Sequence, residues 1–153
     1  MNDYFSKLFH YNHWANELLL QKLYECETQD AEIIKLMSHV INAQFIWFSR
    51  VSGNKALERK VWDLYNLHEL PSASKESSRL WIIFISDLEE EKFNADIFYT
   101  NSQGNQFSTI SSDIFIHVIN HGTYHRGQIA KLLRQKNIDP PNTDYITYVR
   151  AKK

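Results

Sequence analysis

Apolar residues recur every three or four positions along four segments of this 153-residue chain. That spacing is typical of α-helices that bury one face. It predicts four helices, roughly over Tyr4–Cys26, Ala31–Val51, Pro71–Phe93 and from the serine-rich stretch STISS to Asn137. The stretch SGN follows the second helix and two prolines follow the fourth, as expected where helices end.

The segments outside these helices carry other patterns. VWDLYNLHELP is a long, aromatic-rich connection after the second helix. IFYTNSQGNQFSTI alternates apolar and polar residues around the turn SQGN, which predicts a small β-hairpin before the fourth helix. The C-terminal DYITYVRAKK also alternates and is predicted to be extended. We therefore expect one all-α domain over residues 1–153, a four-helix bundle with one long crossover, whose functional sites face inward.

Composition narrows the class of protein. The chain is 43% hydrophobic and has a net charge of −1, so no basic surface indicates nucleic acid. No run approaches the length of about 20 apolar residues that spans a bilayer, and MNDYFSKLFH does not have the pattern of a signal peptide. Cys26 is the single cysteine and permits no internal disulfide. A cytoplasmic protein with neither a nucleic-acid nor a membrane partner is expected.

Three histidines spaced four apart mark the stretch HVINHGTYHRGQ of the fourth helix: His117, His121 and His125. Residues four apart share a helix face, so either neighbouring pair could bind one metal ion. All three cannot, because eight residues rise about 12 Å. The apolar stripe of this helix consists of Ile114, Val118, Ile129 and Leu132. His125 lies near its centre, His121 at its edge and His117 beyond it, so His121 and His125 are predicted to face the interior.

A metal ion needs further ligands, and His39 of the second helix is the best candidate because it lies beside that helix's apolar stripe. The alternative is that these histidines are hydrogen-bonded core residues. Asn12 and Asn16, on the inward face of the first helix, either orient an imidazole or link two helices. Arg126 either binds an anionic substrate or makes a salt bridge.

Four stretches resemble the DinB (damage-inducible) family of four-helix-bundle metalloenzymes: YNHWANELLL, SHVINAQFIWF, HVINHGTYHRGQIAKLL and PPNTDYITYVR. They cover nearly the whole chain, and NHGTYHRGQ is the most specific. The resemblance implies one metal ion held by His39, His121 and His125, with His117 beside the ligands rather than among them. It also implies an up-down bundle, often a homodimer, with a long connection after the second helix, and a role in stress response.

Three neutral imidazoles leave a coordination position open for water or substrate. Zinc is the expected metal, although nickel, copper or iron also suit such ligands. Metalloprotease chemistry is disfavoured because Gly122 occupies the position of the catalytic glutamate in the helical zinc-protease motif. The resemblance implies S-transfer from a low-molecular-weight thiol to a small electrophile. The alternatives are hydrolysis of a small molecule and a structural, non-catalytic metal.

Overall fold

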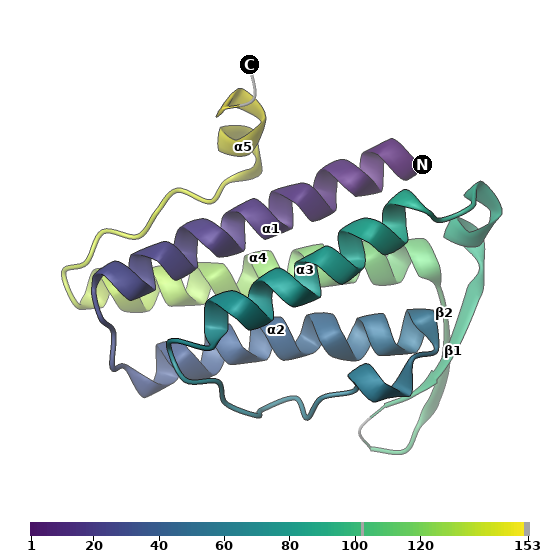
Figure 1. Cartoon of the computed structure of the whole chain (residues 1–153), viewed down its shortest axis with the longest axis horizontal. Helices are drawn as coiled ribbons and strands as arrows, with labels where there is room; N and C mark the ends of the chain where they lie inside the picture. Colours follow the sequence, from purple (N-terminus) through teal and green to yellow (C-terminus); the bar gives the residue numbers. More distant parts are fainter. Residues whose placement is uncertain (102, 152–153) are drawn as a thin grey trace.

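The computed structural model describes residues 1–101 and 103–151. It contains four long helices: α1 (Asn2–Glu25), α2 (Ala31–Ser52), α3 (Leu70–Ser86) and α4 (Ser111–Gln135). The helices lie side by side in a bundle, and the connection between α2 and α3 runs back along its full length (Figure 1). Because of this connection, α2 and α3 run in the same direction, and α1 and α4 run in the opposite direction (Figure 1). Successive helices therefore do not all alternate in direction, as they would in an up-down bundle. The predicted all-α bundle with a long connection after the second helix is confirmed.

Local signals set the ends of α2. Asp30 is its N-cap, and its Oδ1 accepts hydrogen bonds from the backbone N–H groups of Glu32 and Ile33. The other carboxylate oxygen pairs with Lys136 Nζ at 2.6 Å, just beyond the end of α4. Gly53 ends α2 with a φ of 71°, in the left-handed region that favours glycine. Asp30 therefore links the start of α2 to the residue that follows α4.

The predicted hairpin is confirmed. Strands β1 (Asp96–Thr100) and β2 (Gln106–Ile110) pair antiparallel, with Asp96 opposite Ile110. The hairpin leads directly into α4 and projects beside the ends of α2 and α3 (Figure 1). Its Tyr99 ring lies 5.1 Å from the ring of Trp47 on α2, which holds the hairpin against the bundle.

The predicted end of the third helix and the predicted form of the C-terminal tail were wrong. The third helix ends at Ser86 rather than near Phe93, which lies instead in a 3₁₀-helix, η2 (Glu90–Asn94). The break turns the chain so that the Phe93 ring stacks on Phe5 at 5.5 Å in the core. The described part of the C-terminal tail is not extended, because Tyr145–Ala151 forms a short helix, α5; the last two residues of the predicted extended stretch, 152 and 153, lie outside the described residues. Its buried Tyr148 packs against the ring of Trp14 at 5.4 Å, an arrangement that a helical turn provides and an alternating pattern does not reveal.

Polar residues divide the core into two apolar clusters. One cluster is mainly aromatic and includes Phe9, Trp81 and Phe115, and the other is aliphatic and includes Leu19 and Leu133. Between these clusters lie buried polar side chains from all four helices: Asn12, Asn16, Gln44, Ser74, Ser77, Ser78 and Arg126. None of the described helices is long and apolar enough to cross a membrane. The candidate site lies on α2 and α4 near this polar level.

Candidate metal centre

Three histidines from two helices converge on one point. His39 projects from α2, and His121 and His125 project from successive turns of α4; their ligand atoms all lie within 4.8 Å of one another. The ring centroids are 4.4 to 4.8 Å apart in each of the three pairs. The structure therefore brings together the three residues expected to be ligands, and this group could hold a metal ion.

The spacing of the nitrogens fits a metal. His39 Nε2 and His121 Nε2 are 3.0 Å apart. Two nitrogens bound to one tetrahedral ion at about 2.05 Å lie about 3.3 Å from each other. The observed distance between the two nitrogens is therefore close to the one expected if His39 and His121 share an ion.

The long connection orients His39. The Nδ1 atom of His39 lies 3.3 Å from the Val61 carbonyl oxygen, and the Trp62 ring stacks on the imidazole at 4.2 Å with an interplanar angle of 16°. Since a carbonyl only accepts, Nδ1 must carry the hydrogen. The lone pair of the neutral ring is then on Nε2, which faces the other histidines. The backbone of the connection thus selects the tautomer that can bind a metal ion.

Gln128 orients His125 in the same way. The Nδ1–H of His125 donates to Gln128 Oε1 at 2.7 Å, leaving Nε2 as the free ligand atom. Sequence reasoning missed Gln128, although its position three residues after His125 on the same helix face was a usable signal. It also missed Val61 and Trp62, because their approach to His39 depends on the path of the crossover, which no local pattern in the sequence indicates.

Burial keeps two of the imidazoles neutral. It lowers the pKa of His39, and it lowers the pKa of His121 to about 3, with smaller contributions from the charges that His125, His39 and His117 would carry. Protonated imidazole cannot bind a metal ion, so a histidine that stays neutral at physiological pH is already in its ligand form. The electrostatics of the cluster therefore favour metal binding over protonation.

Comparison with known proteins agrees with the fold and the cluster. The family model described as "DinB family" matches residues 1–153, the whole chain. The chain belongs to the DinB family. It is also 28% identical over 166 residues to "Protein DinB" of Bacillus subtilis (strain 168), an alignment that covers 97% of this chain and 95% of that protein. In this DinB chain the histidines of the most specific stretch, NHGTYHRGQ, are the two that α4 contributes to the cluster.

Arg126 faces α1 rather than the histidine cluster. Its Nη1 donates to Asn12 Oδ1 at 2.7 Å and to Asn16 Oδ1 at 2.8 Å, and its Nη2 donates to Thr123 Oγ1 at 3.0 Å. The side chain is only 2% exposed. This burial argues against the substrate-binding role considered for Arg126. Asn12 and Asn16 accept hydrogen bonds from the guanidinium and so link α1 to α4, which is the second of the two roles considered for them.

The two glycines beside the histidines have different surroundings. A Cβ atom at Gly122 would lie 2.8 Å from Asn12 Oδ1 and 2.9 Å from Arg126 Nη1. Gly122 is therefore needed for the close approach of α1 and the Arg126 side chain to α4. A Cβ at Gly127 would meet nothing within 4 Å, so no packing contact requires a glycine there.

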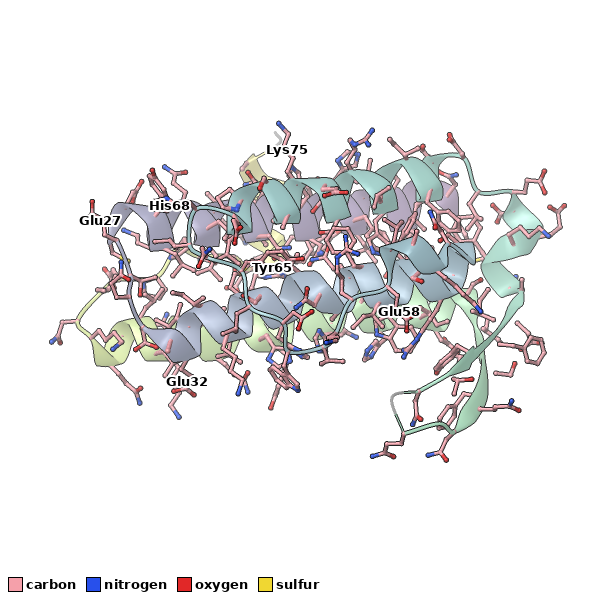
Figure 2. All side chains as sticks on the ribbon, turned by 60° about the horizontal axis from the view of Figure 1, so that its bottom comes forward. Glu27, Glu32, Glu58, Tyr65, His68 and Lys75 are labelled. Atoms are coloured by element: carbon pink, nitrogen blue, oxygen red, sulfur yellow. The ribbon has the colours of Figure 1, made fainter. Side chains whose placement is uncertain are left out.

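The remaining histidines lie outside the three-histidine group. The ring of His117 is 5.6 Å from that of His121 and 5.0 Å from that of Trp47, so it lies beside the cluster on the hairpin side. His68 contacts the Tyr24 ring at 5.9 Å, at the end of the bundle where Glu27 lies (Figure 2). His10 and His13 are on α1, which does not contribute to the group among the described residues.

Proposed function

We propose that this DinB protein is a metal-dependent enzyme that transfers a low-molecular-weight thiol to a small electrophile, with zinc as the metal bound by His39, His121 and His125. The observation that carries the proposal is the three-imidazole group itself. Structural zinc sites are normally closed by four protein ligands, whereas catalytic sites have three and an open position. Among the described residues, no fourth histidine, cysteine or carboxylate joins this group.

The choice of thiol transfer over hydrolysis rests on the residue types in the three-histidine group. Hydrolytic zinc sites commonly place a carboxylate near the metal as general base, and the group here contains only histidines. A bound zinc ion supplies the activation that is needed, because it favours the thiolate form of a coordinated thiol. In the overall reaction the thiol proton passes to solvent, a carbon–sulfur bond forms, and the leaving group departs with the bonding electrons.

The chain's own residues prepare the site for this reaction. The carbonyl of Val61 and the side chain of Gln128 fix the imidazoles of His39 and His125 with Nε2 directed at the shared point. The Trp62 ring covers one face of His39 and limits access of water to it. A reducing, cytoplasmic setting fits the proposal, because low-molecular-weight thiols are kept reduced there.

The test uses untagged protein loaded with zinc. The protein is incubated with each of several cellular thiols and monochlorobimane, and formation of the fluorescent thioether is followed. We expect at least one thiol to react faster than the uncatalysed background, and His125→Ala to abolish that excess. His68→Ala is the matched control, since His68 lies outside the cluster, and should react like the parent protein.

Other outcomes would favour the two alternatives. If no thiol reacts above the His125→Ala background but small esters or amides are cleaved, hydrolysis replaces transfer. If neither activity is found and X-ray absorption spectra show four protein ligands on the metal, the site is structural and the enzyme proposal fails.

A further inference from the structure

A second polar feature lies on the hairpin side of the cluster. A pocket of about 430 Å³ is formed between α2, the 3₁₀-helix η1 (Lys55–Leu57) and strand β1. Its charged lining residues are Arg50, Lys55 and Glu58, and Phe98 and Tyr99 supply aromatic walls. Glu58 is labelled in Figure 2, on the side of the molecule from which the hairpin projects. The pocket thus has two positive charges and one negative charge.

Aromatic rings, rather than an acid, hold Arg50 in this pocket. Its guanidinium carbon lies 4.5 Å from the centre of the Trp47 ring and 4.9 Å from that of Tyr99. Its recorded hydrogen bond, to the Thr100 carbonyl, is long at 3.5 Å. No ion pair within 4.0 Å involves Arg50 in the part of the chain that the structure describes. A planar guanidinium fixed in this manner has most of its five donors available for a carboxylate.

The pocket lies further along α2 than the three histidines. His39 and Arg50 are eleven residues apart on α2, about three helical turns, so they project from nearly the same face about 16 Å apart along the axis. The Trp47 ring that supports Arg50 also contacts His117, which in turn contacts His121. A molecule that bridges the two places must therefore be elongated, with its reactive group at one end.

The geometry points to a subsite in which Arg50, supported by Lys55, binds the carboxylate of an elongated small molecule whose other end reaches the three-histidine group. The inference rests on the proposed function for the reacting end of that molecule. This subsite differs from the substrate-binding role considered for Arg126, because the guanidinium of Arg126 is already bonded to the side-chain amides of Asn12 and Asn16. Here the arginine is open, is oriented by two rings, and faces a pocket large enough for a terminal carboxylate and its neighbouring atoms.

Binding is measured by NMR titration of the full, zinc-loaded chain, following the Trp47 indole N–H resonance. The probe is S-methylglutathione, which carries two carboxylates and a blocked sulfur, so binding does not depend on thiol transfer. Its diethyl ester, which lacks both carboxylates and keeps the ammonium group, is the matched probe without negative charge. We expect the ester to bind about tenfold more weakly, the effect of losing one charge-assisted contact worth about 1.4 kcal/mol.

Four variants separate charge from shape. Arg50→Gln should weaken binding of the acid about tenfold and leave the ester unchanged, and Arg50→Lys should give an intermediate loss because it keeps the charge without the planar fork. Glu58→Gln should tighten binding of the acid roughly two- to fivefold by removing a like charge from the pocket. Arg79→Gln, which replaces an exposed arginine on α3 outside the pocket, should change nothing.

Three results would overturn the inference: equal affinity for acid and ester, the same dissociation constant for Arg50→Gln and Arg79→Gln, or no shift of the Trp47 resonance at millimolar probe. Failure of the proposed function would give results different from these three. If the acid binds through Arg50 but no thiol reacts, the subsite stands and the reaction is another one. If thiol transfer occurs but is indifferent to Arg50, the function stands and the subsite does not.

Discussion

At the scale of single residues, the contact between α1 and α4 depends on the missing side chain of Gly122. Replacing Gly122 with alanine gains helix propensity of about 1 kcal/mol. The new Cβ, however, would lie 2.8 Å from Asn12 Oδ1 and 2.9 Å from Arg126 Nη1, both held in a buried hydrogen-bond network. We expect Gly122→Ala to lower the free energy of unfolding by about 1–3 kcal/mol, as overpacking does.

Gly127→Ala provides the matched control, because its Cβ would meet nothing within 4 Å. That variant should gain up to about 1 kcal/mol from helix propensity alone. Urea denaturation of both variants checks the prediction. Equal stabilisation by the two substitutions would show that the Asn12–Arg126 network yields freely and that the close approach at Gly122 is not tight.

The proposed metal binding should also depend on single side chains. Untagged protein should contain about one metal ion per chain by elemental analysis, and His121→Ala should reduce that content to a small fraction, since it removes one of three ligands. His117→Ala is the matched control on the same helix, one turn away and outside the group. It should retain the metal. Equal metal content in the parent and His121→Ala would contradict the assignment.

At the scale of elements, Asp30 couples the start of α2 to the end of α4. One carboxylate oxygen caps the backbone of α2 and the other pairs with Lys136. We expect Asp30→Ala to cost about 1–2 kcal/mol of unfolding free energy, because it removes the cap. Asp30→Asn, which keeps an acceptor oxygen for the cap, should cost about half as much and should match Lys136→Gln.

The Asp30 contribution should vary with pH in a defined direction. The hydrogen bond to Lys136 is the largest cause that holds the pKa of Asp30 below its usual value of 3.8 in the folded protein. A lowered folded-state pKa gives stability that is present above the unfolded pKa and is lost as the pH falls through the folded one. The difference between the parent and Asp30→Asn should therefore shrink below about pH 4. A difference that is constant down to about pH 2 would rule out the ionised carboxylate as its source.

An element could be predicted from the sequence when the residues that determine it lie close together in the chain. The periodicity of α1, α2 and α4 and the SQGN turn of the hairpin are local patterns, so these elements were predicted from sequence. The end of α3 is set by burial of Phe93 against Phe5, a contact between distant segments. In the short tail helix, seven residues are too few for the apolar positions to distinguish the spacing of a helix from that of a strand. Packing of Tyr148 against Trp14 selects the helix.

The candidate site divides in the same way. His121 and His125 lie one turn apart on the inward face of one helix, and this could be read from their spacing. His39 could be placed on the right helix, but its meeting with them depends on how α2 packs on α4. Val61 and Trp62 approach His39 through the long connection, whose path no local pattern encodes. The position of Arg126 was predicted on α4, yet its direction toward Asn12 and Asn16 is a tertiary property.

At the scale of the whole molecule, the three-histidine group and the buried Arg126 network lie on different sides of α4. His121 and His125 face α2, and Arg126 faces α1 from the adjacent position. Rotation of α4 about its axis would break both sets of contacts together. The buried Arg126 network therefore helps to hold the two histidines toward His39, although it touches neither the proposed substrate pocket nor the shared metal point.

The bundle also leaves large apolar side chains on its surface, which suggests that a second copy covers some of them. Leu64 of the aromatic connection is 66% exposed, and Tyr124 of α4 is 65% exposed. We predict a homodimer formed either through the connection or through α1 and α4, burying about 800 Å² on each chain. Leu64→Ser should produce monomers in the first case, because it places a hydroxyl at an apolar interface. Tyr124→Ser should do so in the second case, because it removes an aromatic ring from the interface. Phe98→Ser is the control, as Phe98 is 78% exposed on the hairpin, outside both surfaces. Light scattering coupled to gel filtration measures the mass, and a parent protein that stays monomeric at the highest attainable concentration would contradict the prediction.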